Sequence, residues 1–162
     1  MKAVLQRVSQ ASVVVGGEEV GRIGTGLVIL LGVERGDEER DSTFLSRKCV
    51  ELRIFPDDAG KMNRSLKDVA GRVLLISQFT LPADWKKGRR PSFIRAAHPT
   101  DGEHLYHHFA QQVRALGIPV QTGVFGVHME VNLTNDGPVT LILDHQFATD
   151  ETDVQTAEAH AD

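Results

Sequence analysis

Hydroxyl and amide side chains follow a strongly apolar run near the middle of the chain. The run spans residues 73–76, and Ser77, Gln78, Phe79 and Thr80 come directly after it. Where a strand ends, its backbone N–H and C=O groups leave the ladder and can face a ligand, while the strand behind holds them rigid. This segment therefore offers hydroxyls, an amide and free N–H groups at one fixed place.

A second polar segment meets an apolar run further along the chain. Residues 135–140 read Asn-Asp-Gly-Pro-Val-Thr, and the apolar run 141–143 follows them. The Gly137-Pro138 linkage is of the one kind that is readily cis, and a cis bond presents its carbonyl in a fixed, unusual geometry. A plain hairpin turn also accounts for this composition, because Asn, Asp, Gly and Pro are the usual turn residues.

Ser77 and Thr80 are candidates for a catalytic nucleophile. A hydroxyl needs a base within hydrogen-bond reach, and the neighbouring sequence supplies none. Neither residue lies in a G-x-S-x-G elbow. From these residues alone, turn hydrogen bonds therefore explain both side chains better than catalysis does.

A basic run begins a few residues after Thr80. Between Asp84 and Arg95 the chain carries five basic residues and one acid, together with Trp85 and Phe93. Such a run is usually a solvated loop, but it also suits the capture of nucleic-acid phosphates with stacking on an aromatic ring. Four of its basic residues lie close together in the sequence: Lys86, Lys87, Arg89 and Arg90.

Length and composition favour one domain with its own core. The chain has 162 residues, of which 41% are hydrophobic and 25% charged, and such values are ordinary for a globular protein. No stretch approaches the roughly 20 apolar residues of a membrane span, and the N-terminal residues lack the apolar core of a signal peptide. We therefore expect a cytoplasmic protein. The single cysteine, Cys49, falls in an apolar helical stripe and is expected to be a buried, inert thiol.

The net charge of −4 is unevenly distributed along the chain. Residues 146–162 hold five acidic residues and no Lys or Arg, so the rest of the chain has 18 basic and 17 acidic residues. Apolar periodicity is absent from the same 17 residues. We expect a domain over residues 1–145 and an acidic, disordered tail over residues 146–162, because the tail has no apolar pattern to bury.

The hydrophobic pattern predicts an α+β fold. Alternation or continuous apolar runs predict strands over residues 2–8, 12–15, 19–23, 27–33, 72–80, 118–125, 128–134 and 138–144. An apolar stripe predicts a helix from Asp37 to about Phe55. The capping-box spacing of Thr100 and Glu103 predicts a second helix, closed by Gly117. Strands at both ends around two helices favour a single compact domain with a mixed, largely antiparallel sheet, layered or barrel-like.

Several of these segments, in this order and spacing, resemble the D-aminoacyl-tRNA deacylases, the D-tyrosyl-tRNA(Tyr) deacylase family. These enzymes remove wrongly attached D-amino acids from tRNA. The similarity extends over residues 1–145 and is carried by residues 1–8, 77–81, 87–93, 123–126 with Met129, and 135–144.

The resemblance implies a carboxylic ester hydrolase that proofreads chirality in translation by cleaving D-aminoacyl-tRNA. The pocket for the terminal adenosine and the aminoacyl group would be lined by Ser77, Gln78, Phe79 and Thr80, with Phe125, Gly126 and Met129 beside them. The tRNA would be bound by Lys86, Lys87, Arg89 and Arg90. The ester lies beside a free ribose hydroxyl, so the substrate is able to supply the acid/base group while the Phe79 and Thr80 N–H groups hold the oxyanion.

The resemblance also implies a homodimer that uses no metal and no cofactor. Gly137-Pro138 would be cis and would enter the active site of the other subunit, where its carbonyls exclude L-amino acids but not glycine. Two alternatives stay open. One is the related branch that edits L-alanyl-tRNA, whose motifs differ from Phe79 and Val139 here, and the other is a non-catalytic tRNA-binding module that uses only the basic run.

Overall fold

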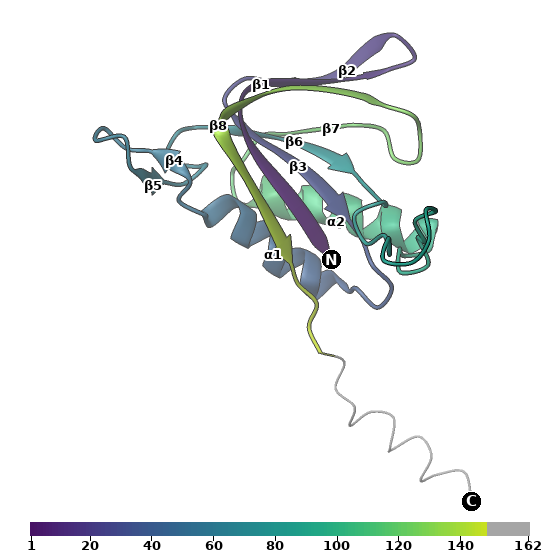
Figure 1. Cartoon of the computed structure of the whole chain (residues 1–162). Coiled ribbons are helices and arrows are strands. Elements are labelled where there is room, and N and C mark those ends of the chain that lie inside the picture. Colours follow the sequence, from purple (N-terminus) through teal and green to yellow (C-terminus); the bar gives the residue numbers. More distant parts are fainter. Residues whose placement is uncertain (149–162) are drawn as a thin grey trace, which may run out of the picture.

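The computed structural model describes residues 1–148, and Figure 1 shows how its elements follow one another. The strands are β1 (Lys2–Val15), β2 (Glu18–Ile23), β3 (Gly26–Gly32), β4 (Phe55–Pro56), β5 (Met62–Arg64), β6 (Arg72–Ser77), β7 (Val120–Thr122) and β8 (Glu130–Asp144). The helices are α1 (Glu39–Glu51) and α2 (Pro99–Ala115). Disorder was expected of residues 146–162, and residues 149–162 of this tail lie outside the described residues. Gln146 and Phe147 are described and bind the body of the domain, since Gln146 Nε2 donates to Asp37 Oδ1 at 3.2 Å and the Phe147 N–H donates to Asp41 Oδ1 at 2.7 Å.

One sheet of six strands organises the fold. Its strand order is β2-β1-β3-β6-β7, and β8 also pairs with β1. β1 is antiparallel to β2, β3 and β8, whereas β3 with β6 and β6 with β7 are parallel pairs. The prediction of an α+β fold with a mixed, largely antiparallel sheet is confirmed.

The long strand β1 pairs with different strands in its two halves, and the sheet thereby curves into a barrel-like shape (Figure 1). Its first half, residues 2–8, pairs with β3, and its second half, residues 11–15, pairs with β2. β2 thereby lies over β6, since a Cβ built at Gly21 would be 3.3 Å from Leu74 Cδ1. A small second core fills the space between the two parts and includes Val13, Ile23, Leu74 and Ile76.

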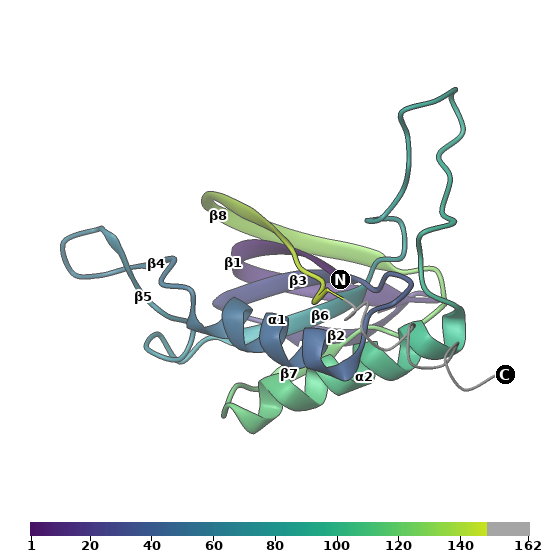
Figure 2. The same ribbon diagram turned by 90° about the horizontal axis from the view of Figure 1, so that it is seen from below.

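Both helices cover one face of the sheet, as Figure 2 shows, and the main core lies between the two layers. Its large side chains come from strands and helices alike. Leu5, Leu75, Leu45 and Phe109 are each at most 1% exposed. Neither helix of residues 1–148 is long and apolar enough to cross a membrane.

α1 is shorter than predicted at both ends. Asp37 does not cap it, because the Asp37 carboxylate accepts the Glu34 N–H at 2.7 Å instead. The helix ends at Glu51, and Phe55 belongs to the short strand β4. Cys49 lies on its buried face, and burial raises the pKa of that thiol to about 12, as expected of an inert thiol.

Pairing across the sheet joins four of the predicted strands into two longer ones. Residues 2–8 and 12–15 form one strand, β1, and residues 128–134 and 138–144 are joined in another, β8. Shifts in the β1–β8 register, between Gln6 and Val8 and between Val8 and Gln10, absorb the extra residues, so pairing continues on either side. In contrast, the predicted strand 118–125 shortens to β7, and α2 begins one residue before Thr100, with Pro99 at its first position.

Candidate active site

The turn after β6 is held tightly against β3. The Gln78 N–H donates to the Leu31 carbonyl at 2.8 Å, and the Leu81 N–H donates to the Gln78 carbonyl at 3.2 Å. A Cβ built at Gly32 would lie 3.0 Å from the Gln78 carbonyl oxygen and 2.9 Å from Leu81 Cβ. Glycine at position 32 therefore allows the close approach that fixes this turn to the sheet.

Two backbone donors in the turn have no acceptor among residues 1–148. Within residues 1–148, the N–H groups of Phe79 and Thr80 donate no hydrogen bond. The Phe79 side chain is 59% exposed and meets the Phe93 ring edge to face, with the ring centroids 5.2 Å apart. Fixed, unsatisfied N–H groups of this kind are able to stabilise an oxyanion.

The side chains predicted at the end of β6 do not all face the same space. Ser77, Gln78 and Phe79 line a pocket of about 600 Å³, whereas Thr80 is absent from its lining. The Thr80 Oγ1 instead accepts a hydrogen bond from Gln78 Nε2 at 2.6 Å. In the described part of the chain, no carboxylate or imidazole hydrogen-bonds the Ser77 or Thr80 hydroxyl, so neither has an activating base there.

The pocket lies between the end of β6, the start of α2 and the loop of residues 123–129. All three residues that the sequence places beside it are part of its lining: Phe125, Gly126 and Met129. Its remaining walls are largely apolar and include Leu31, Val33, Ile76, Ala96 and Ala97. Such a lining favours a small organic group and keeps water out.

α2 and a glycine set the position of the loop wall. The Tyr106 hydroxyl donates to the Leu75 carbonyl at 2.8 Å, and burial raises the pKa of Tyr106 to about 12, so this donor stays protonated. The Tyr106 ring packs 5.8 Å from the Phe125 ring, centroid to centroid. A Cβ built at Gly123 would lie 2.5 Å from Met129 Sδ, so a larger residue there would push the Met129 side chain from its present place.

A larger hollow of about 850 Å³ shares Phe79, Ala96, Ala97 and Pro99 with this pocket. Five carboxylate residues and one arginine line it, namely Glu34, Asp37, Glu38, Glu39, Asp101 and Arg35. A surface with this excess of negative charge repels a polyanion. The smaller, apolar pocket is therefore the better candidate for an active site that serves a nucleic acid.

The basic run forms an arm that extends away from the sheet (Figure 2). We define the basic arm as residues 84–95. Its neck is closed by two backbone hydrogen bonds between Asp84 and Ser92, each 2.8 Å long. Beyond the neck lie Lys86, Lys87, Arg89 and Arg90, all exposed and none in an ion pair with another residue of the described chain.

The second predicted segment is an exposed turn in β8 with a cis Gly137-Pro138 bond. The Asn135 side chain brackets this turn: its Oδ1 accepts the Val139 N–H at 2.7 Å, and its Nδ2 donates to the Val139 carbonyl at 3.2 Å. Gly137 has a φ of 151°, and a Cβ there would lie 2.7 Å from the Val139 nitrogen. The turn is therefore specified by glycine and held in one shape.

Arg7 is a further candidate that sequence reasoning did not single out. It is 9% exposed, and its Nε donates to the Asp136 carbonyl at 2.8 Å while its Nη1 donates to the Ile54 carbonyl at 2.7 Å. These bonds hold the residue that precedes the Gly-Pro turn. The signal was present in the alternation of β1, because Arg7 falls in the inward phase of Ala3 and Leu5, where a charge needs partners.

The Gly-Pro turn and the pocket lie far apart in one chain. Through the strand register, Arg7 beside the turn is level with Leu27 and Val73, whereas Ser77 is four residues further along β6. β1 and β3 also separate β8 from β6. At about 3.3 Å per residue and about 4.8 Å per strand, the offset is about 13 Å along the strands and about 14 Å across them. One chain does not bring these two predicted parts of the site together.

The fold and this site are those of an α+β protein with an apolar pocket next to a positively charged arm. A family model described as D-Tyr-tRNA(Tyr) deacylase matches residues 4–144. The chain therefore belongs to the D-Tyr-tRNA(Tyr) deacylase family.

Relatives of known name agree with this assignment. The chain is 58% identical over 144 residues to a D-aminoacyl-tRNA deacylase of Pelobacter propionicus, and the alignment covers 89% of this chain and 99% of the relative. It is 55% identical over 152 residues to a D-aminoacyl-tRNA deacylase of Geobacter sulfurreducens, covering 94% of this chain and 100% of the relative.

Two solved structures have the same fold. One, described as c-Myc DNA Unwinding Element Binding Protein, is 40% identical, with a TM-score of 0.86 and coverage of 91% of this chain and 100% of that one. The other, described as a probable eukaryotic D-amino acid tRNA deacylase, is 20% identical, with a TM-score of 0.76 and coverage of 89% and 98%.

Proposed function

We propose that this protein hydrolyses the ester bond of D-aminoacyl-tRNA and releases the D-amino acid and free tRNA. The observation that carries the proposal is the pair of unsatisfied N–H groups of Phe79 and Thr80, beside an apolar pocket and just before the basic arm. Membership of the deacylase family supports the same reaction. The reaction would remove D-amino acids from tRNA before the tRNA is used in translation. We therefore place it in the cytoplasm, where translation takes place.

The proposed chemistry needs no protein nucleophile. Water adds to the ester carbonyl carbon, and the Phe79 and Thr80 N–H groups stabilise the negative charge that forms on the carbonyl oxygen. The neighbouring ribose hydroxyl of the substrate assists the proton transfers. The bond from the carbonyl carbon to the ribose oxygen then breaks, and that oxygen takes up a proton. Ser77 and Gln78 supply polar contacts to the adenosine and the aminoacyl group in the pocket.

The basic arm holds the tRNA in this proposal. Its four exposed cations, Lys86, Lys87, Arg89 and Arg90, are free to bind phosphates near the acceptor end of the tRNA. Only a few residues separate them from the Phe79 and Thr80 donors. Phosphates held on the arm would therefore place the terminal ester at the pocket.

The active form is a homodimer in which each Gly137-Pro138 turn enters the pocket of the partner subunit. The turn is exposed and rigidly held, yet it is too far from the pocket of its own chain. A twofold dimer brings each turn to the opposite pocket and completes both sites at once. Further along β8, Ile142 is 77% exposed, and a dimer partner would cover such an apolar side chain.

Chirality is then selected by exclusion. Carbonyl groups of the turn lie where the side chain of an L-amino acid would project, so an L-substrate is rejected by overlap and desolvation. The D side chain points elsewhere and needs no specific recognition. Glycine has no side chain to reject, and we expect glycyl-tRNA to be cleaved as well.

Deacylation rates on D-, L- and glycyl-tRNA test the function directly. We expect hydrolysis of D-substrates of different side-chain size and of glycyl-tRNA, with L-aminoacyl-tRNA left intact. Release of L-alanine alone would assign the chain to the related editing branch. Binding of tRNA without hydrolysis of any ester would make the protein a binding module and overturn the proposal.

A further inference from the structure

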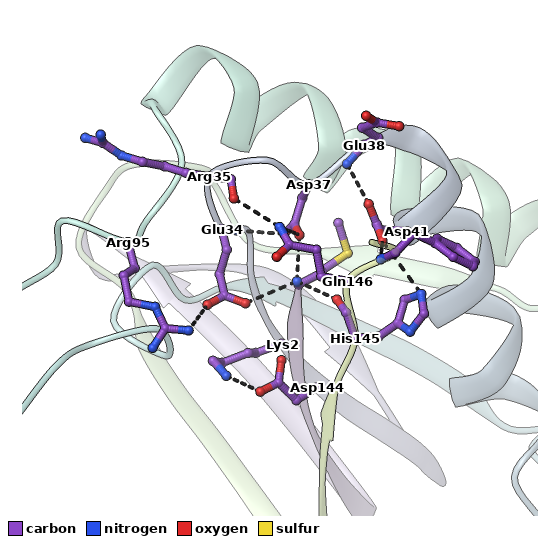
Figure 3. Close-up of polar contacts among 12 residues, drawn as sticks. Lys2, Glu34, Arg35, Asp37, Glu38, Asp41, Arg95, Asp144, His145 and Gln146 are labelled. Carbon is purple, nitrogen blue, oxygen red and sulfur yellow. Dashed lines mark hydrogen bonds and ion pairs between the residues drawn. The ribbon is translucent and has the colours of Figure 1, made fainter. Parts of the chain in front are cut away.

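We propose that Glu34 is a positioning residue that holds the base of the basic arm at the edge of the pocket through Arg95. The inference rests on the proposed function, because the arm and the pocket are parts of that site. Glu34 is 7% exposed, and Figure 3 shows its carboxylate next to the guanidinium of Arg95. Its Oε1 accepts from Arg95 Nη2 at 2.9 Å, and its Oε2 accepts from the Met1 ammonium at 3.2 Å.

The same two segments are also joined through their backbones. The Arg35 N–H donates to the Arg95 carbonyl at 2.9 Å, and the Ala97 N–H donates to the Val33 carbonyl at 3.0 Å. Ala96, between these bonds, and Ala97 both line the pocket. The place where Glu34 meets Arg95 therefore adjoins the pocket wall, and a displaced arm base would shift Ala96 and Ala97 in that wall.

Glu34 is itself fixed before it meets Arg95. Its backbone N–H donates to Asp37 Oδ2 at 2.7 Å, and Asp37 Oδ1 accepts from the Met1 ammonium at 2.7 Å (Figure 3). An isolated surface ion pair contributes little, because both long side chains must be ordered to form it. Here the carboxylate is already ordered by a buried network, so only the Arg95 side chain, 59% exposed, loses freedom.

This role predicts a loss of rate without a loss of tRNA binding. Glu34→Gln and Arg95→Gln should each lower kcat about tenfold, because the pocket wall shifts while the tip of the arm keeps its phosphate contacts. KM for the aminoacyl-tRNA and the salt dependence of tRNA binding should stay near those of the wild-type protein. The double variant should be no slower than either single variant, since both changes break one interaction. Arg95→Lys keeps the charge and should retain most of the activity.

A second readout does not depend on activity. Trp85 is the only tryptophan of the chain and lies on the arm, 72% exposed. Its fluorescence anisotropy should fall in both Gln variants, because a released arm moves more freely. Arg64→Gln is the matched control: it breaks a 2.8 Å ion pair with Asp58, far from the arm, and should change neither kcat nor the anisotropy.

Three results would overturn the inference. If Arg95→Gln reduces the salt dependence of tRNA binding, Arg95 is a phosphate ligand and not a positioning partner. If Glu34→Gln slows the reaction and Arg95→Gln does not, Glu34 acts elsewhere. Unchanged Trp85 anisotropy in Arg95→Gln, whose exposed side chain makes misfolding no concern, would also contradict it. If the wild-type protein cleaves no D-aminoacyl-tRNA, the proposed function fails, and the anisotropy still decides whether Glu34 positions the arm.

Discussion

In the proposed mechanism, the residues at the end of β6 act through backbone N–H groups rather than through reactive side chains. The Thr80 hydroxyl accepts a hydrogen bond from Gln78 and has no base beside it in the described chain. We expect Thr80→Ala to remain active, with kcat lowered about tenfold or less, the effect of losing one hydrogen bond of about 1 kcal/mol. Single-turnover deacylation of a D-aminoacyl-tRNA measures this, and Thr80→Ser should match the wild-type rate.

Removal of a true catalytic nucleophile lowers kcat far more, roughly 10⁶-fold in a serine protease. A Thr80→Ala protein that folds normally and binds tRNA but shows a loss of that order would contradict the backbone role.

The family resemblance predicted most of the pocket lining but not its support. The place of Ser77, Gln78 and Phe79 after an apolar run only suggested a site, whereas the resemblance predicted that they line a pocket, and they do line one. The direction of Thr80 is set by the turn itself, which the sequence pattern does not describe. Arg7 was missed because its partners are carbonyls of residues 54 and 136, distant in sequence and without any side-chain signature.

At the scale of the structural element, the loop of residues 123–129 is positioned at the pocket through a close contact at a glycine. A Cβ at Gly123 would lie 2.5 Å from Met129 Sδ, so Gly123→Ala should displace the Met129 side chain that lines the pocket. We expect kcat/KM to fall about 100-fold, the effect of a misplacement near 1 Å. Gly24→Ala is the control, because a Cβ at Gly24 meets nothing within 4 Å. Equal deacylation rates for the two variants would show that the Met129 contact does not matter.

The basic arm should act on tRNA binding through charge alone. Replacing Lys86, Lys87, Arg89 and Arg90 by Gln should weaken binding and flatten its dependence on salt by about 0.7–0.9 in the log–log slope for each lost contact. Binding isotherms at several salt concentrations measure the slope. Lys61→Gln with Lys67→Gln removes exposed charge near β5 and should leave the slope unchanged. A slope that stays constant in the arm variant would mean that the arm is only a solvated loop.

Local patterns predicted which segments are strands better than where the strands end. Residues 2–8 and 12–15 were predicted as two strands because the alternation is interrupted between them. The structure continues the strand through register shifts against β8, and that pairing partner lies more than a hundred residues away. Only the partner decides whether a polar interruption ends a strand or becomes an irregularity in it.

The arrangement of the whole molecule separates two motifs that sequence reasoning placed in one site. The Gly137-Pro138 turn is level with Val73, while the pocket begins at Ser77, with two strands between β8 and β6. Spacing along the chain does not reveal this distance, because it depends on sheet order and on the parallel pairing of β3 with β6. This separation allows a direct test of whether two chains build each active site.

Two variants with different defects should complement each other if two chains build each site. Gly137→Ala distorts the turn and leaves its own pocket intact, since the added Cβ would lie 2.7 Å from the Val139 nitrogen. Gly123→Ala distorts the pocket and leaves the turn intact. Each protein alone should be nearly inactive. In a mixed dimer, the pocket of the first variant receives the turn of the second, so one of the two sites is complete.

Random reassociation after joint refolding makes half of the dimers mixed. Activity should therefore recover to about a quarter of the wild-type value, because each mixed twofold dimer holds one intact site of two. Each variant refolded alone is the control and should gain nothing. If the mixture is no more active than the sum of its parts, while size-exclusion chromatography shows dimers in both proteins, the turn does not serve the partner's pocket. The rejection of L-amino acids would then have to come from residues of a single chain.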